Sequence, residues 1–223
     1  MIKINTKGFT IIELLIATVV FSLVLLVVSA GIVQVGRSYY KGLAESRTLD
    51  ATRGMVDDIA QAIQFSGGEV INSTAGDVKG FCIGNTLYAA RPGQVALGTQ
   101  HATSKRQLTS ACGSTGTNVQ PAFFNAGLGD KDMLGERMRV VNVDITRPSP
   151  SLYTITLRVA YGDNDTLCKS SLAASAQGGC NATATTFPNQ LSYVGQDVQC
   201  KNSRSTSQFC AVTEITTTVQ KRL

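Results

Sequence analysis

The longest apolar run in the chain lies close to its N-terminus. Twenty consecutive residues from Leu14 to Val33 carry no charge, and the apolar character continues to Val35. At about 1.5 Å of rise per residue, a helix of this length spans roughly 30 Å, the thickness of the hydrocarbon core of a bilayer. The pattern therefore predicts a helix that crosses a membrane.

A second helical pattern follows the apolar run. Its apolar positions recur at spacings of seven, three and four residues, and the other side of the helix is filled by charged and polar residues. The apolar positions are Leu49, Val56, Ile59 and Ile63, and the polar ones are Asp50, Arg53, Asp57, Asp58 and Gln61. This half of the helix is expected to pack on a globular domain.

An unbroken helix over residues 9–65 would measure roughly 85 Å, so a globular domain can cover only its second half. Gly31 and Gly36 lie within it, and each glycine costs up to about 1 kcal/mol relative to alanine. We therefore expect local bending or melting between them. Ser66-Gly67-Gly68 ends the helix, because glycine is the usual residue just past a helix C-terminus.

Four later stretches have the composition or the alternation of strands. They are residues 80–91, 137–147, 152–161 and 210–222. In the second, Arg139, Val141, Val143 and Ile145 are predicted to share one face. In the third, Tyr153, Ile155, Leu157, Val159 and Tyr161 alternate with polar residues. Pro148-Ser149-Pro150 between these two predicts a hairpin turn and an antiparallel pair.

The stretches 93–120 and 162–208 carry no periodic pattern and are predicted to be long loops. The predicted fold class is therefore α+β: a long N-terminal α-helix packed on an antiparallel sheet of about four strands, with disulfide-braced loops.

Six cysteines, all placed after the apolar run, form an even set, and in an exported domain they predict three disulfides. Fifteen connectivities are possible. Nearest-neighbour pairing is preferred because each bond then closes a loop-rich stretch: Cys82–Cys112, Cys168–Cys180 and Cys200–Cys210. A zinc site is disfavoured, because no pair has the spacing C-x₂-C to C-x₄-C and the one histidine is His101. No metal or cofactor is predicted.

Glu13 is a carboxylate at the edge of the apolar run, with no Lys or Arg on a neighbouring helical turn. Because an ionisable group at membrane depth is costly, its partner is expected outside this segment. Lys3 and Lys7 precede the run in a leader short enough to stay cytoplasmic, so the C-terminal part is exported. A secretory signal peptide cut within Val28-Ser29-Ala30-Gly31 is the rival interpretation, although such a peptide has no use for Glu13.

These N-terminal residues carry a family resemblance. A short leader with Lys3 and Lys7, then Gly8, Phe9 and a glutamate four residues beyond, resembles the class III signal of type IV prepilins and type II secretion pseudopilins. The end of the predicted helix, residues 55–67, is similar to the close of the first helix in the PilW/PulJ group of minor pilins. Beyond residue 70 the resemblance is one of architecture and cysteine style.

The resemblance implies a processing scheme. Prepilin peptidase would cut between Gly8 and Phe9 and would N-methylate Phe9. Residues 1–8 would be the leader, residues 9–35 the membrane-spanning and later filament-core half of the helix, and residues 36–223 the exported pilin domain. Glu13 would then pair with the charged N-terminus of a neighbouring subunit.

By the same resemblance the chain is a structural subunit and not an enzyme: a minor pilin that supports pilus assembly, motility or adhesion. Its partners would be other pilins, prepilin peptidase, and the inner-membrane platform and motor. The precursor would reside in the inner membrane and the assembled subunit in an extracellular pilus. The alternatives are a J-type pseudopilin of a type II secretion system and a filament-borne receptor for DNA or a surface.

Evidence for DNA binding is weak in the sequence. The net charge is +5, and Lys3 and Lys7 contribute two of these charges, which is too little to predict a nucleic-acid surface. A small basic group could form near the C-terminus from Lys201, Arg204, Lys221 and Arg222.

Two acidic triplets, 130–132 and 163–165, are rich in oxygen ligands but do not continue as EF-hand loops, so they are predicted to form turns. His101 lies among polar residues without the setting of a Ser-His-Asp site. No catalytic motif is found.

Overall fold

One long helix, α1 (Ile11–Phe65), opens the part of the chain that the structure describes. The structure is a computed structural model that describes residues 10–66, 69–75, 78–95, 103–108, 132–169, 198–201 and 207–222. The helix is uninterrupted through Gly31 and Gly36, so the local melting expected there does not occur. The chain divides into two units inside α1, between Tyr40 and Lys41.

The second half of α1 buries one stripe of side chains, as its periodicity predicts. The buried residues are Ala44, Thr48, Thr52, Met55, Val56, Ile59 and Ile63, and Leu49 is half-buried. The two threonine hydroxyls are satisfied within the helix: Thr48 donates to the carbonyl of Ala44 at 2.7 Å, and Thr52 to that of Thr48 at 2.6 Å. The helix therefore contributes no unpaired hydroxyl to the core at these positions.

The first sheet is an antiparallel meander of four strands. Its order is β1 (Val70–Ala75), β2 (Val78–Ile83), β3 (Thr86–Ala90) and β4 (Thr103–Gln107). The expected single strand over residues 80–91 is wrong, because β2 and β3 fold back at the two-residue turn Gly84-Asn85. Gly84 has a φ of +59°, which suits the first position of a tight hairpin turn.

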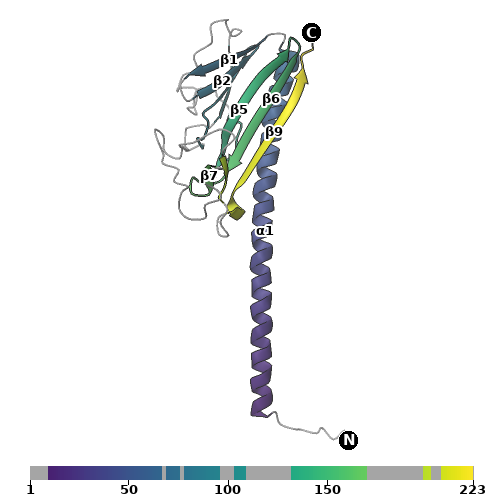
Figure 1. Cartoon of the computed structure of the whole chain (residues 1–223), viewed down its shortest axis with the longest axis vertical. Coiled ribbons are helices and arrows are strands. Elements are labelled where there is room, and N and C mark those ends of the chain that lie inside the picture. Colours follow the sequence, from purple (N-terminus) through teal and green to yellow (C-terminus); the bar gives the residue numbers. More distant parts are fainter. Residues whose placement is uncertain are drawn as a thin grey trace. The chain divides into compact units, whose positions relative to one another are not determined.

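The second sheet contains β5 (Met138–Ser149), β6 (Leu152–Tyr161) and β9 (Ala211–Gln220), with β6 in the middle (Figure 1). Both pairings are antiparallel, which confirms the predicted hairpin. The predicted face of β6 is also confirmed, because Tyr153, Ile155, Leu157 and Val159 are buried and the intervening residues are half-exposed.

The predicted face of β5 is wrong in its first half. The register of β5 against β6 shifts between Val140 and Asn142, which marks a β-bulge. Two residues of β5 there oppose one of β6, so the alternation changes phase. Val140 consequently joins Val143 in the main core, whereas Val141 lies in a separate cluster with Ala160.

The third sheet is a short pair, β7 (Leu167–Lys169) and β8 (Val198–Cys200), followed by the 3-10 turn η2 (Ser207–Phe209). These strands and β4 lie in stretches that were expected to be irregular. The α+β fold class is confirmed, but the strands divide among three sheets instead of one.

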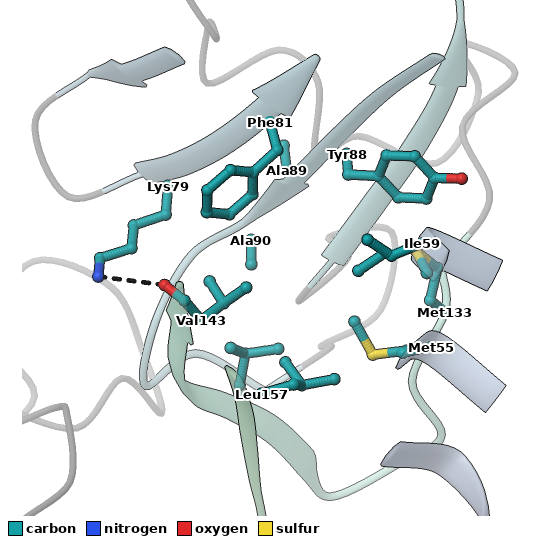
Figure 2. Close-up of a pocket in the computed structure, with 11 residues that line it drawn as sticks. Met55, Ile59, Lys79, Phe81, Tyr88, Ala89, Ala90, Met133, Val143 and Leu157 are labelled. Carbon is teal, nitrogen blue, oxygen red and sulfur yellow. Dashed lines mark hydrogen bonds between the residues drawn. The ribbon is translucent and has the colours of Figure 1, made fainter. Parts of the chain in front are cut away.

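The main core joins the second half of α1 to the two larger sheets. It contains Ile59 and Ile63 of α1, Phe81 of β2, and Ile155 and Leu157 of β6. Figure 2 shows a small apolar cavity of about 20 Å³ within this core, with Met55 and Ile59 on one side and Phe81 and Tyr88 on the other. Because its lining is apolar, a water there would lack hydrogen-bond partners, so the cavity is a packing gap that stays dry.

Candidate functional site

Thr10 and Glu13 form a reciprocal hydrogen-bonded pair at the start of α1. The backbone N–H of Thr10 donates to Oε2 of Glu13 at 2.9 Å, and the Thr10 hydroxyl donates to the same oxygen at 2.8 Å. In return, the N–H of Glu13 donates to Oγ1 of Thr10 at 3.4 Å. This arrangement is a capping box, in which the N-cap residue and the third helical residue satisfy each other's N–H groups.

The capping box corrects one expectation about Glu13. Its carboxylate was expected to find a partner only outside the segment, yet within the single chain it accepts two hydrogen bonds from Thr10. Thr10 was missed as a site residue. The signal was available, because Thr-x-x-Glu immediately before an apolar run is the sequence signature of a capping box.

The first half of α1 exposes an unusually large apolar surface. Every residue from Ile11 to Val35 is exposed, and among the large apolar side chains the exposed fraction runs from 49% for Leu25 to 82% for Ile11. Within the described residues, α1 alone is long and apolar enough to cross a membrane, judged by length and composition. Surface of this kind marks a site that lipid or another protein covers.

A shallow apolar groove runs along this helix from Glu13. It is lined by Glu13, Ile16, Ala17, Val20, Phe21 and Val24, whose spacing of three and four residues places them on one face. Glu13 is the one ionisable group in the groove. The face could therefore accept an apolar helix that brings a positive charge to its end.

Comparison with known proteins identifies this segment. A family model described as the prokaryotic N-terminal methylation motif matches residues 3–29. The chain carries a prepilin-type N-terminus. No curated protein and no solved structure matches the chain.

The prepilin-type match supports membership of the type IV pilin and pseudopilin superfamily, and it spans Gly8, Phe9 and Glu13. Gly8 and Phe9 lie outside the residues that the structure describes, so cleavage and methylation there stay predictions. The described fold, a long N-terminal helix on antiparallel sheets, is pilin-like.

The four described cysteines are all disulfide-bonded. One bond joins Cys200 to Cys210, with the two Cα atoms 5.7 Å apart, and it ties the end of β8 to the start of β9. Cys82 and Cys168 are also in disulfides. The predicted pairs Cys82–Cys112 and Cys168–Cys180 each include a residue outside the described part, so those two pairings stay predictions.

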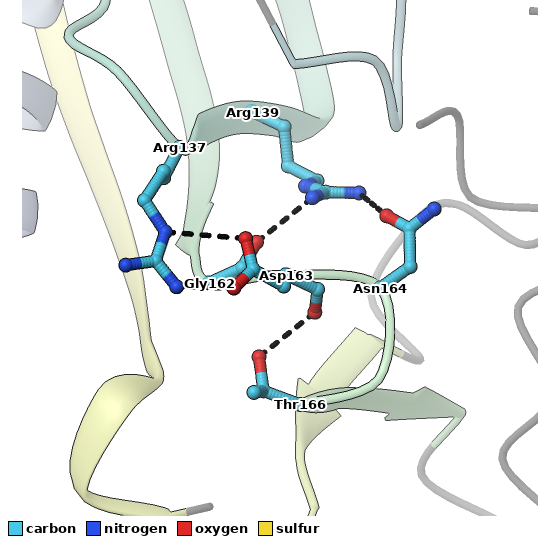
Figure 3. A network of polar contacts seen from close by, with 6 residues as sticks. All are labelled: Arg137, Arg139, Gly162, Asp163, Asn164 and Thr166. Atoms are coloured by element: carbon cyan, nitrogen blue, oxygen red, sulfur yellow. Dashed lines mark hydrogen bonds and ion pairs between the residues drawn. The ribbon is translucent and has the colours of Figure 1, made fainter. Parts of the chain in front are cut away.

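The acidic triplet 163–165 contacts two arginines (Figure 3). Arg137 forms a two-pronged ion pair with Asp163, in which Nε lies 3.1 Å from Oδ1. Hydrogen bonding to that carboxylate raises the pKa of Arg137 above its usual range. The predicted turn is confirmed separately, because the N–H of Thr166 donates to the carbonyl of Asp163 at 3.0 Å.

Arg139 lies beside this ion pair and is 1% exposed. Its Nη1 donates to the carbonyl of Gly93 at 3.3 Å and to Oδ1 of Asn164 at 2.5 Å, and its Nη2 donates to the carbonyl of Gly162 at 2.8 Å. One guanidinium therefore joins β5, the loop after β6 and the segment after β3. Arg139 was predicted on the same strand face as Val141, Val143 and Ile145, with no role assigned to it.

The described members of the basic group near the C-terminus, Lys201, Lys221 and Arg222, do not gather in one place. The N–H of Lys201 donates to the carbonyl of Thr166, near the end of the sheet where Tyr161 pairs with Ala211. The N–H of Lys221 donates to Ser151 at the opposite end of β9. A ten-residue strand separates the two ends by roughly 30 Å. Arg204, His101 and Asp130 lie outside the described residues.

A third polar cluster ties α1 to the first sheet. Nζ of Lys105 in β4 lies 2.6 and 2.7 Å from the two carboxylate oxygens of Asp58 in α1, and 5.5 Å from the ring centre of Tyr88. Burial of the Tyr88 phenol raises its pKa well above the usual range, and the nearby Asp58 carboxylate raises it further. Asp58 was predicted on the polar side of the helix and is half-buried here.

Proposed function

We propose that this chain is a minor pilin-like structural subunit of a type IV pilus. The precursor would be cut after Gly8, would wait in the inner membrane through the first half of α1, and would then enter a filament through the same helix. Residues 36–223 would form the exported pilin domain. The observation that carries the proposal is the groove of α1, in which a carboxylate adjoins an exposed apolar face of a prepilin-type helix.

An apolar face of this kind is suited to two successive environments. Leu, Val and Ile side chains pack against like helices as readily as against lipid, because both surroundings are dry and apolar. The helix can therefore leave the bilayer for a bundle of similar helices with little loss of apolar contact. What changes between the two environments is the partner of Glu13.

The capping box suggests how that exchange would proceed. Before assembly, Thr10 supplies two hydrogen bonds that satisfy the Glu13 carboxylate. In the filament, the amino group of a neighbouring subunit's Phe9 would offer a charge-assisted bond to the same oxygens, which is shorter and about twice as strong as a neutral one. In a water-poor bundle this attraction would be weakly screened and would fix the axial register of the subunits.

The proposed partners are other pilins, prepilin peptidase, and the inner-membrane platform and motor, to which the ATP chemistry would belong. Six cysteines and long insertions support a minor subunit over the bulk one. A J-type pseudopilin of a type II secretion system would use the same helix chemistry. Genomic neighbours separate the two: pilus genes accompany one, and secretin and exoprotein genes the other.

The Glu13→Ala variant tests the proposal. Cleavage should remain normal, because the processing site is intact, while incorporation into filaments should fall at least about tenfold, since a hydrogen bond to a charged group contributes about 1.5–3 kcal/mol. The measurement is quantitative immunoblotting of cleaved precursor in membranes and of subunit in sheared filaments. Glu45→Ala is the matched control, since Glu45 is an exposed glutamate of α1 that pairs with Lys41 at 3.7 Å. Equal incorporation of the Glu13→Ala and Glu45→Ala variants would contradict the pairing of Glu13 with the N-terminus of a neighbouring subunit.

A further inference from the structure

Two tyrosines and an arginine lie on α1 directly after its apolar run. Tyr39 is 64% exposed and Tyr40 is 55% exposed, and their rings meet edge to face with centroids 6.1 Å apart. Arg37 is also exposed. These are the side chains that concentrate where a membrane meets water, because each joins an apolar body to a polar tip.

Their depth along the helix fits that location. Tyr39 and Tyr40 lie four and five residues beyond Val35, about 6–7.5 Å along the axis. Side chains on a helix lean towards its N-terminus, so each ring covers the surface about one turn earlier, roughly 1–2 Å past the end of the apolar run. The headgroup layer on one side of a bilayer is about 5–7 Å thick. The rings therefore fall within it.

The three side chains lie within an arc of about 160° around the helix axis. Successive residues turn by about 100°, so Tyr39 lies about 160° and Tyr40 about 60° around the axis from Arg37. Lipid surrounds a helix on all sides, and anionic phosphates complement the Arg37 guanidinium.

We propose that Arg37, Tyr39 and Tyr40 form an interfacial belt that binds the phospholipid headgroups of the outer leaflet of the membrane holding the precursor. The proposal rests on the membrane stage of the proposed function and not on filament assembly. The belt would fix the depth of α1 in the bilayer. Ile11, where α1 begins, lies about 42 Å along the axis from the backbone of Tyr39 and about 37 Å from the level of its ring, which exceeds the hydrocarbon core of about 30 Å. The belt thus places the start of α1 at the opposite headgroup layer, beside the processing site.

The chain contains no tryptophan, so one introduced tryptophan is a unique fluorescent reporter. The full-length Tyr39→Trp and Tyr40→Trp variants would be reconstituted in vesicles of phosphatidylethanolamine and phosphatidylglycerol. These would contain lipids brominated near the headgroup or near the chain end. The matched control is Phe21→Trp, at an exposed aromatic position inside the apolar run.

The belt predicts that shallow bromines quench the two tyrosine-site variants at least about twofold more than deep bromines, with the order reversed for the Phe21→Trp variant. Quenching of the tyrosine-site variants by aqueous acrylamide alone, while the Phe21→Trp variant is quenched by deep bromines, would overturn the belt and leave membrane insertion intact. Failure of every bromine to quench the Phe21→Trp variant would overturn the membrane stage and the belt together.

A second measurement tests whether the belt sets depth. Tyr39→Ser with Tyr40→Ser, made in the Phe21→Trp background, should change the ratio of deep to shallow quenching of the reporter. It should also slow cleavage by prepilin peptidase by several-fold. Replacing both tyrosines by phenylalanine keeps the ring and removes the hydroxyl. This variant should recover part of the parent quenching ratio and part of the parent cleavage rate. An unchanged quenching ratio in the serine variant would contradict the positional role.

Discussion

At the scale of residues, the chain uses short-range partners to satisfy groups that would otherwise be costly. Glu13 accepts two hydrogen bonds from Thr10, and Tyr88 lies between the main core and the Asp58–Lys105 ion pair. Neither arrangement follows from composition. Each depends on one spacing or one fold-level contact.

The Thr10→Val variant tests the capping box. The valine side chain keeps the shape of threonine but lacks the hydroxyl that donates to the Glu13 carboxylate and accepts from the Glu13 N–H, so only the backbone N–H of residue 10 still donates to Glu13. The first turn of α1 should therefore lose about 0.5–2 kcal/mol of local stability. The measurement is amide exchange of residues 11–14 in the full chain in detergent micelles, with faster exchange expected. Thr10→Ser is the control and should exchange as the parent does. Unchanged protection in the valine variant would contradict the capping role.

Tyr88 makes the stability of the protein depend on pH at the alkaline end. Because its pKa is raised in the folded state, the folded protein holds the phenol proton more tightly than the unfolded chain does. The contribution of Tyr88 to the stability of the folded state is fully present below about pH 10, the ordinary tyrosine pKa. This contribution is lost as the pH rises from there through the raised pKa of the folded state. Absorbance titration of the phenols should show a delayed tyrosine, and Tyr88→Phe should remove that step. A titration curve unchanged in shape by the substitution would refute the assignment.

At the scale of elements, long periodic segments were predictable and short or irregular ones were not. The strand over residues 152–161 was correctly bounded because ten alternating residues give a clear pattern. The three-residue strands β7 and β8 carry too few positions for a period to show. The β5 bulge shifted Val141 to another cluster, since a single extra residue inverts the alternation without changing the composition.

The hydrogen bonds of Arg139 act at the scale of elements, because they connect parts of the chain that are far apart in sequence. Arg139→Met should destabilise the fold by at least about 2 kcal/mol, since it leaves the acceptors of Gly93, Gly162 and Asn164 without their donor. Arg139→Lys should not restore stability, because an ammonium cannot reproduce the planar fork.

The free energy of unfolding of the full chain in detergent, measured with denaturant, checks this. Arg53→Ala, at an exposed arginine of α1, is the control and should stay within about 0.5 kcal/mol. An Arg139→Met variant as stable as this control would show that the network contributes nothing.

At the scale of the whole molecule, the two units differ in what they bury. Residues of the second unit build a core from α1 and two sheets, braced by Cys200–Cys210. The first unit leaves its apolar side chains exposed. The α+β class and the long apolar helix were predictable, because the periods of helix and strand are local signals. The cut between Gly8 and Phe9 stays a prediction. The division into three sheets was not predictable, because it depends on contacts between distant segments.

The measurement that tests the central claim most directly is mass spectrometry of purified filaments. The account predicts a peptide that begins at N-methylated Phe9, at lower abundance than the peptides of the major subunit. Filaments that lack this chain, from cells in which its precursor is present in the membrane, would contradict the account.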